Sequence, residues 1–341
     1  MKKINLGIIG CGYWGPNFVR NFSQMPQVRI TGICDASQEK LSHIRQTHSN
    51  IPTCRDYSRL LKDSKLDAVI ISTPASTHYA IAREALLKRK HVLVEKPISI
   101  KAEEARELID LAQKVKKILM VGHTFLYNLA VRKIKEIIEK KELGKIYYIH
   151  SRRTNLGPIR KDVNAVWDLI PHDISIVNYL LQDTPIEVSA HSQRFLSHDL
   201  EDVGFVILRY PRNILVHLHS SWLDPKKIRE MTIIGDKKML VYDDTDTHEP
   251  IRLYDKSVMK KKYDKEYHTF REYQMIIKNG QVNTPHLDMQ EPLKIECRHF
   301  IDCITAGSRP LTDGENGLAV LKVLNAIDKS VSQKGRFVKV T

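Results

Sequence analysis

The first third of the chain alternates between short apolar runs and segments with the apolar spacing of helices. Short apolar runs at 4–9, 28–34, 67–72, 91–94 and 118–121 predict strands, and the continuous apolar order of 69–71 is typical of a strand that is buried on both faces. Between these runs, apolar residues three or four positions apart predict helices, among them 81–87 and a long amphipathic one at 102–116. This alternation predicts a parallel sheet with helices on both faces.

Beyond residue 122 the pattern changes. A helix is predicted at 128–141, and strand-like runs follow at 146–150, 188–193, 203–210, 213–222, 231–234 and 239–242. Within 213–222, apolar residues occupy every second position, which is typical of a sheet that is covered on one face and joined mainly by hairpins. Helices are predicted at 292–307 and 314–329. We therefore expect an α/β protein of two domains, 1–122 and 123–341.

Composition supports a globular chain of more than one domain. The 341 residues are 42% hydrophobic and 28% charged. No apolar run approaches the roughly 20 residues that span a bilayer, and the apolar start is short and interrupted by glycines, so we expect a cytoplasmic protein without a membrane span. The five cysteines are odd in number and form no CxxC pair, which indicates neither a disulfide framework nor a metal site.

The chain is basic, with 54 lysines and arginines against 40 acidic residues, a net charge of +14. The lysines are spread over predicted helices, and no aromatic-interleaved basic stripe or helix-turn-helix pattern is present. We therefore expect no nucleic-acid partner. A solvated surface with some attraction for a phosphorylated small molecule explains the charge.

A glycine motif follows the first predicted strand. Gly10, Gly12 and Gly15 stand between the run at 4–9 and a helix that begins near Pro16. In a dinucleotide-binding turn, the first glycine permits the tight turn, the second lets the backbone approach the pyrophosphate, and the third allows close packing of helix and strand. A glycine turn without a ligand is the alternative.

An acidic residue occupies the position that such a turn requires. Asp35 lies 20 residues after Gly15, at the end of the second predicted strand. A carboxylate accepts a hydrogen bond from a ribose 2′-hydroxyl and repels a 2′-phosphate, so Asp35 predicts NAD rather than NADP. Capping of the helix after Ser37 is a second role for Asp35, and the two roles are compatible.

A lysine lies just after the apolar run at 91–94, in the segment Glu95-Lys96-Pro97. A lysine at a strand end is commonly a solvated surface residue. However, ligands bind at the carboxyl ends of strands in doubly wound sheets, which makes Lys96 a candidate for chemistry. Pro97 restricts the turn, and its peptide bond is a candidate for the cis form.

The densest polar segment of the second half contains an Asp–His pair. Asp168 and His172 are four residues apart and share one face if the segment is helical. A carboxylate beside an imidazole sets its tautomer and raises its basicity, which suits a general base. A capping or surface pair has the same spacing, whereas a metal site lacks a third ligand.

Together these motifs resemble a known family. The glycine turn, Ser72-Thr73-Pro74 with Thr77-His78, Glu95-Lys96-Pro97, and Asp168 with His172 are similar to motifs of the Gfo/Idh/MocA oxidoreductase family, in order and over essentially the whole chain. The resemblance implies an N-terminal Rossmann domain and a C-terminal α/β domain with an open-faced, mostly antiparallel sheet. It also implies bound NAD(P) and homodimers or homotetramers that form through that sheet.

Within the family, the chain resembles nucleotide-sugar dehydrogenases. The residues that carry this likeness are 153–160, 162–164, 167–173, 221–225, 291–293, Glu296 and 312–314. This resemblance implies oxidation of the 3-hydroxyl of UDP-N-acetylglucosamine or a related UDP-sugar to a 3-keto sugar, as in polysaccharide biosynthesis.

The resemblance also implies residue roles. His172 would take the hydroxyl proton, and Asp168 would orient the His172 imidazole or relay through it. Lys96 would hydrogen-bond the reacting oxygen. The cofactor would contact Gly10, Gly12, Tyr13, Trp14, Gly15, Asp35, Ser72, Thr73, Pro74, His78, Glu95 and Lys96. The substrate would contact Lys96, His123, Arg153, Asn155, Arg160, Asn164, Trp167 and His172. Trp167 fits core packing equally well, and some relatives carry tyrosine where this chain has His172.

Two other functions stay open at this point. The same fold could reduce a keto-sugar or oxidise a free sugar or cyclitol, although Asp35 weakens the case for a reductase. A regulatory protein that binds NAD without chemistry is a third hypothesis. The intact set of Lys96, Asp168 and His172 argues against it, because a sensor needs no proton-transfer groups.

Overall fold

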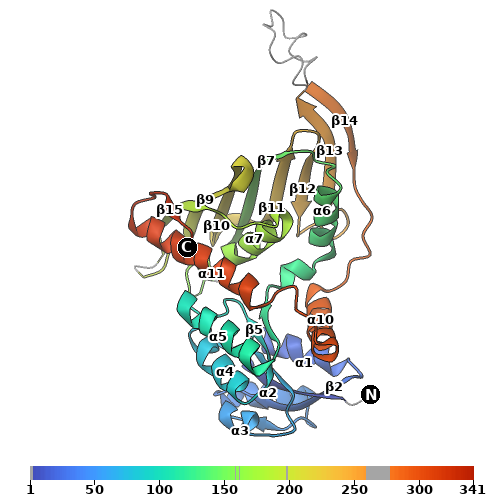
Figure 1. The fold of residues 1–341 in the computed structure, drawn as a ribbon, viewed down its shortest axis with the longest axis vertical. Coiled ribbons are helices and arrows are strands. Elements are labelled where there is room, and N and C mark those ends of the chain that lie inside the picture. Colours follow the sequence, from blue (N-terminus) through green and yellow to red (C-terminus); the bar gives the residue numbers. More distant parts are fainter. Residues whose placement is uncertain (1–2, 158, 161, 197–198, 259–276) are drawn as a thin grey trace, which may run out of the picture. The chain divides into compact units, whose positions relative to one another are not determined.

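The computed structural model describes residues 3–157, 159–160, 162–196, 199–258 and 277–341 (Figure 1). Its contacts divide the chain into two compact units, residues 1–127 with 290–322 and residues 128–289 with 323–341. A single cut near residue 122 does not describe these contacts, because residues 290–322 return to the first unit. The assignment of NAD binding to 1–122 and of substrate binding to 123–341 stays a prediction.

The first unit contains the predicted parallel sheet, with the strand order β3-β2-β1-β4-β5-β6. The strands are β1 (Ile4–Ile9), β2 (Val28–Cys34), β3 (Thr53–Cys54), β4 (Ala68–Ile71), β5 (His91–Glu95) and β6 (Leu119–Gly122). The helices are α1 (Gly15–Ser23), α2 (Gln38–Thr47), α3 (Tyr57–Leu61), α4 (Ala75–Leu87), α5 (Ala102–Val115), the 3-10 helix η1 (Thr124–Tyr127) and α10 (Pro292–Ala306). Only the short β3 and α3, together with η1, lay outside the sequence expectation.

The continuous apolar runs are explained by burial on both faces of this sheet. Ile8 and Ile70 belong to the cluster on one face, and Val69 and Ile71 alternate with them toward the other; all four are fully buried. A period of two therefore leaves no position along β4 for a polar side chain.

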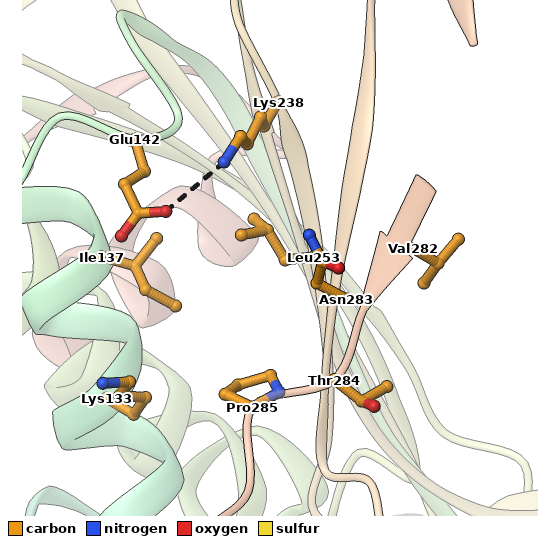
Figure 2. Close-up of a pocket in the computed structure, with 9 residues that line it drawn as sticks. All are labelled: Lys133, Ile137, Glu142, Lys238, Leu253, Val282, Asn283, Thr284 and Pro285. Carbon is orange, nitrogen blue, oxygen red and sulfur yellow. Dashed lines mark hydrogen bonds and ion pairs between the residues drawn. The ribbon is translucent and has the colours of Figure 1, made fainter. Parts of the chain in front are cut away.

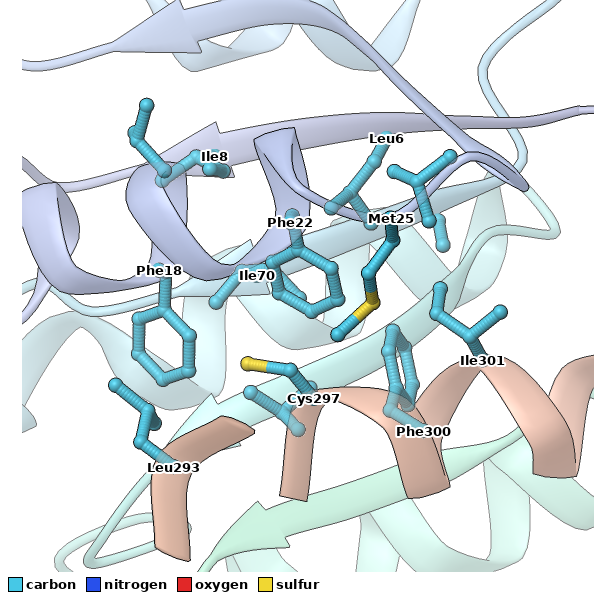
Figure 3. Close-up of a cluster of buried hydrophobic side chains, with 14 of the residues drawn as sticks. Leu6, Ile8, Phe18, Phe22, Met25, Ile70, Leu293, Cys297, Phe300 and Ile301 are labelled. Carbon is cyan, nitrogen blue, oxygen red and sulfur yellow. The ribbon is translucent and has the colours of Figure 1, made fainter. Parts of the chain in front are cut away.

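A segment near the end of the chain completes the core of the first unit. Leu293, Cys297 and Phe300 of α10 pack with Phe18 and Phe22 of α1 in one buried cluster (Figure 3). Without α10, this face of α1 would expose two phenylalanines to water. The return of residues 290–322 is therefore part of the hydrophobic core rather than an appendage.

The second unit is built on a mostly antiparallel sheet of nine strands in the order β14-β13-β12-β11-β7-β10-β9-β8-β15. The strands are β7 (Ile146–Leu156), β8 (Glu187–Gln193), β9 (Val203–Tyr210), β10 (Ile214–Ser221), β11 (Leu223–Gly235), β12 (Met239–Asp243), β13 (Ile251–Val258), β14 (Ile277–Asn283) and β15 (Val338–Lys339). A 3-10 turn, η2 (Pro211–Asn213), joins β9 to β10. The helices are α6 (Leu129–Glu139), α7 (Ala165–Leu181) and α11 (Gly314–Ser332), the last of which belongs to the second unit from Val323 onward.

One face of this sheet is covered and the other is open, as expected. Helix α7 packs against β7, β9 and β10. On the opposite face Tyr148, Phe205 and Leu215 are between 44% and 47% exposed, and Phe205 stacks on His219 with ring centroids 4.5 Å apart. The expected homodimer or homotetramer through this face stays a prediction. In the described part of the chain, no helix combines the length and apolarity of a membrane span.

The strand expected at 146–150 is longer in the structure. β7 continues to Leu156 because both of its edges are paired, in parallel with β10 and antiparallel with β11. The β7–β10 pair also shows that hairpins do not make all the connections in this sheet. The polar residues Arg152, Arg153 and Asn155 therefore lie on a strand rather than in a loop.

The contribution of α10 to the first unit can be measured. Phe300→Ala should lower the free energy of unfolding by about 3–5 kcal/mol, because it opens a cavity between α10 and α1. Leu87→Ala, at a position that is 51% exposed, is the control and should cost about 1 kcal/mol or less. Equal losses in urea unfolding of the two variants would contradict the assignment of α10 to this core.

Candidate functional site

Predicted site residues of the first unit gather at one edge of its sheet. Because all strands run in parallel, the residues that follow them leave the sheet at the same edge. Gly10 follows β1, Asp35 follows β2, Ser72 follows β4, Lys96 follows β5 and His123 follows β6. The edge therefore collects a glycine turn, a carboxylate, a hydroxyl, an amine and an imidazole.

The glycine turn has the geometry that close approach of a ligand backbone requires. Gly10 has a φ of +99°, and a Cβ there would lie 2.6 Å from the Ser72 carbonyl carbon. A Cβ on Gly15 would collide with the carbonyl oxygen of Gly10, so the third glycine keeps α1 close to β1. A Cβ on Gly12 would meet nothing within 4 Å, which leaves its backbone open to a ligand.

The start of α1 is suited to an anion. Pro16 occupies the first turn, and no side chain caps the helix at Trp14. Uncapped N–H groups at a helix N-terminus attract phosphate oxygens. Tyr13 is 82% exposed and packs edge-on against Trp14. The open backbone at Gly12 and the uncapped helix fit a dinucleotide pyrophosphate.

Asp35 is held by the glycine turn and by the next helix. Its Oδ2 accepts the backbone N–H of Cys11 at 2.6 Å, and its Oδ1 accepts the N–H of Ser37 at 2.8 Å. Ser37 is itself the N-cap of α2. The turn-stabilising role of Asp35 is therefore present. Because each carboxylate oxygen has two lone pairs, the ribose role remains compatible with it.

His78 joins the loops that follow β4 and β5. Its ring lies 2.7 Å from the carbonyl oxygen of Pro97 and 2.8 Å from that of Thr73. Burial lowers the pKa of this imidazole. The Lys96–Pro97 peptide bond is cis. His78 thus supports the turn that carries Lys96, and a direct contact of its buried ring with a cofactor stays a prediction.

Three buried ionisable groups surround the end of β6. Glu95, His123 and Glu296 are each at most 6% exposed. Burial raises the pKa of Glu95 to about 7 and lowers that of His123 to about 3. The sequence placed Glu296 among the residues that carry the family resemblance but assigned it no contact at the site, since a glutamate on a predicted helix carries no sign that it is buried.

Helix α7 of the second unit carries Asp168 and His172, four residues apart. The helix begins at Asn164, whose Oδ1 accepts the N–H of Trp167 at 2.9 Å. Asp168 accepts a hydrogen bond from Arg160 at 2.9 Å, so a cation holds its carboxylate. The predicted helix face that bears a carboxylate and an imidazole is therefore present.

Other substrate candidates of this unit have partners of their own. The Asn164 amide donates to Glu201, and the Trp167 indole N–H donates to Asp328, so both help to fix the helix. Arg160 also binds Asp162 through both ends of its guanidinium. Asn155 lies half-buried near the end of β7. Their predicted contacts with a substrate are not tested by these interactions.

Arg153 is buried in a two-point ion pair. Its Nε and Nη2 donate to the Asp173 carboxylate at 3.0 and 3.1 Å, and both side chains are at most 5% exposed. Ser151 donates to the same carboxylate at 3.1 Å. The pair ties β7 to α7 directly after His172. This guanidinium thus has a structural role, and its expected contact with a sugar diphosphate stays a prediction.

The proposed catalytic set is divided between the two units. Lys96 belongs to the first, and Asp168 and His172 belong to the second. A cavity of about 460 Å³ in the second unit lies between α6 and the strands β13 and β14, where Lys238 and Glu142 form an ion pair of 3.4 Å (Figure 2). None of the predicted site residues lines it.

Comparison with known families decides the classification. Residues 4–123 match the family model described as "Oxidoreductase family, NAD-binding Rossmann fold", and residues 131–241 match the "GFO/IDH/MocA C-terminal domain". The chain belongs to the Gfo/Idh/MocA oxidoreductase family. Its N-terminal region is thus the NAD-binding Rossmann fold of that family, in agreement with the glycine turn and Asp35.

Three curated members of the Gfo/Idh/MocA family illustrate the range of relatives. The uncharacterized oxidoreductase YrbE of Bacillus subtilis is 28% identical over 60% of this chain and 61% of its own length. Inositol 2-dehydrogenase 2 of Saccharopolyspora erythraea is 24% identical over 62% and 65%. UDP-N-acetylglucosamine 3-dehydrogenase of Acidithiobacillus ferrooxidans is 29% identical over 71% and 75%. The match thus spans less than two thirds of the first two relatives.

A solved structure with the same fold is GenD2 from gentamicin A biosynthesis, in complex with NAD. It is 19% identical, has a TM-score of 0.83 and covers 100% of this chain and 97% of its own. At this identity, the likeness shows the Gfo/Idh/MocA fold and nothing about the substrate.

The structural role of Arg153 can be separated from substrate binding. Arg153→Met should lower the free energy of unfolding by about 3–5 kcal/mol, because it leaves the Asp173 carboxylate buried without its partner. The exposed pair of Arg209 and Glu187 provides the control, and Arg209→Met should cost about 1 kcal/mol or less. Urea unfolding measures both. An Arg153→Met variant as stable as the unmodified protein would contradict this role.

Proposed function

We propose that this protein oxidises a hydroxyl group of a sugar with NAD as hydride acceptor. The favoured substrate is the 3-hydroxyl of a UDP-N-acetylhexosamine or a related UDP-sugar, which becomes a 3-keto sugar. The observation that carries the proposal is the amine of Lys96 at the ligand-binding edge of the NAD domain. The similarity to a UDP-N-acetylglucosamine 3-dehydrogenase supports the choice of substrate.

The cofactor-binding part of the proposal rests on the strand edge. Gly10, Gly12 and Gly15 with the start of α1 would hold the pyrophosphate, and Asp35 would accept from the adenosine ribose. The nicotinamide half of the cofactor would be lined by Ser72, Thr73, Pro74 and Glu95. His78 would support this lining through its contact with the Thr73 carbonyl oxygen. When bound, the cofactor supplies a hydride acceptor.

The proton chemistry is assigned to three side chains. His172 takes the proton of the sugar hydroxyl, since a neutral imidazole is a base suited to neutral pH. Asp168, held by Arg160, orients the helix face that carries this imidazole. Lys96 donates a hydrogen bond to the reacting oxygen and stabilises the negative charge that develops there.

A second candidate is the oxidation of a free sugar or cyclitol. The inositol dehydrogenase relative favours this alternative, because it shares the family and a similar identity. The two proposals differ in one chemical requirement. A nucleotide sugar needs groups that bind a diphosphate, whereas a cyclitol needs only groups that bind hydroxyls.

The NAD preference is predicted to depend on Asp35. Asp35→Ser should weaken NAD binding and reduce the discrimination against NADP by about tenfold or more, because the carboxylate that repels a 2′-phosphate is removed. Fluorescence titrations with NADH and NADPH measure both dissociation constants. Glu39→Gln, on the exposed surface of α2, is the control. Unchanged discrimination in Asp35→Ser would contradict the ribose role.

The substrate proposal is tested by NADH formation with a panel of hydroxyl compounds. UDP-N-acetylglucosamine and UDP-glucose should give higher rates than free glucose and myo-inositol. Equal rates across the panel would exclude nucleotide-sugar specificity, and preference for myo-inositol would favour the cyclitol alternative.

Protein variants, assayed with the compound of this panel that gives the highest rate, test the residue roles. Lys96→Met and His172→Ala should each lower turnover by about 100-fold or more and leave the dissociation constant of NAD nearly unchanged. Lys101→Met, at a nearby lysine whose side chain is 66% exposed, should retain turnover. Near-normal turnover in both site variants would refute the catalytic assignment.

A further inference from the structure

A buried cluster of ionisable side chains lies at the ends of β5 and β6, and none of its members takes part in the proposed proton transfer from the sugar hydroxyl. Glu95 ends β5, His123 directly follows β6, and Glu296 lies on α10. Their exposed fractions are 6%, 1% and 0%. Three ionisable groups at this depth require an explanation, because burial penalises every charged form.

The two glutamates contact the segment 122–124, which contains His123. Gly122 is paired with Glu95 across β5 and β6, and a Cβ on Gly122 would lie 3.0 Å from the Glu95 Oε2. Two residues further on, the Thr124 hydroxyl donates to the Glu296 Oε2 at 2.7 Å. His123 stands between these two contacts. Gly122 and Thr124 therefore bring the two carboxyl groups to one short segment, and His123 is the residue between them in sequence.

The cluster is only half satisfied by hydrogen bonds. The Glu95 Oε2 accepts the backbone N–H of Lys96 at 3.2 Å, and the Glu296 Oε2 has Thr124. Within the described residues, the Oε1 atom of each glutamate and both ring nitrogens of His123 have no hydrogen-bond partner. Buried polar atoms without partners are rare in folded proteins and commonly mark a functional group.

Two close carboxyl groups in such an environment do not both ionise at neutral pH. Burial, and then the charge of Glu95, raises the pKa of Glu296 well above its ordinary value. Burial raises the pKa of Glu95 to about 7, against the opposing effect of the Lys96 amine. The thiol of Cys297 also faces both glutamates, and burial raises its pKa. Burial, and then the charge of Lys96, lowers the pKa of His123, which leaves this imidazole neutral. The pair therefore holds at least one proton.

The cluster lies at the part of the strand edge that would hold the nicotinamide half of the cofactor. In the strand order 3-2-1-4-5-6, a dinucleotide binds across the point where the order reverses, between β1 and β4. Asp35 marks the adenosine side after β2, so the residues after β4, β5 and β6 serve the nicotinamide side. The nicotinamide ring is cationic in NAD⁺ and neutral in NADH. A unit charge nearby changes a buried proton equilibrium by about tenfold to a hundredfold.

We propose that Glu95, Glu296 and His123 form a buried proton-holding cluster whose protonation follows the charge of the nicotinamide ring. Binding of NAD⁺ expels one proton from the Glu95–Glu296 pair to solvent, and binding of NADH leaves that proton in place. The resulting carboxylate balances the ring cation. The net charge at the strand edge is then the same with either form of the cofactor.

Proton exchange on cofactor binding tests this proposal without any sugar substrate. Calorimetric titrations of the whole protein with NAD⁺ and NADH are run at one pH in buffers of different ionisation enthalpy. NAD⁺ should release up to about one proton and NADH almost none. Correspondingly, the dissociation constant of NAD⁺ should fall by at most about tenfold per pH unit from about pH 6 to about pH 8, while that of NADH stays nearly constant.

Glutamine variants identify the source of the proton. Glu95→Gln and Glu296→Gln keep the size of each side chain, and each should remove the difference in proton release between NAD⁺ and NADH. Glu107→Gln on the exposed surface of α5 is the control and should retain the difference. Release that persists in both site variants, or that disappears only in Lys96→Met, would overturn the proposal.

An infrared measurement on the unmodified protein covers the case in which a variant does not fold. The difference spectrum between the NADH and NAD⁺ complexes should contain the carbonyl band of one additional protonated carboxylic acid in the NADH complex. A spectrum without that band, or no difference in proton release in the unmodified protein, would refute the cluster's role. Because no sugar is present, these outcomes are independent of the proposed substrate.

Discussion

Parallel pairing of six strands is the constraint on which the NAD-binding unit depends. Strands that run in one direction must leave the sheet at one edge, so residues far apart in the chain become neighbours there. Gly10, Asp35, Ser72, Lys96 and His123 are unremarkable individually, each a single residue after an apolar run. Their common edge makes them candidates for one ligand-binding site, and the reversal of strand order between β1 and β4 divides that edge into two halves.

Burial separates the polar residues of this chain into two kinds. Arg153 and Asp173 satisfy each other inside the second unit, and this matched pair connects β7 to α7. Glu95, Glu296 and His123 are buried as deeply, but one oxygen of each glutamate and both ring nitrogens of His123 have no hydrogen-bond partner among the described residues. The first arrangement is stable as it stands. In the second arrangement the pKa values of the glutamates are raised, so their protonation can respond to a change in the charge of the nicotinamide ring at this edge of the sheet.

The elements of the first unit could be predicted from the sequence because a buried parallel strand leaves a continuous apolar run. The same rule failed for the polar half of β7, since the pairing of both edges with β10 and β11 extends a strand that carries Arg152 and Arg153. It also gave no sign of β14, whose residues are mostly exposed. The glycine turn and Asp35 were predictable in type and position. The hydrogen bond between Asp35 and Cys11 was not, because it joins two loops that follow different strands.

By itself, the sequence determined the alternation of strands and helices, the dinucleotide turn, NAD as cofactor and the family, since these depend on local spacing and residue type. Tertiary structure alone decided that α10 completes the first core, that Arg153 is a buried structural partner, and that Glu296 lies with Glu95 and His123. The physical reason is the same in each case. Burial and pairing depend on which distant segments meet. The sequence around a glutamate on a helix is the same whether water or a second carboxyl group faces that side chain.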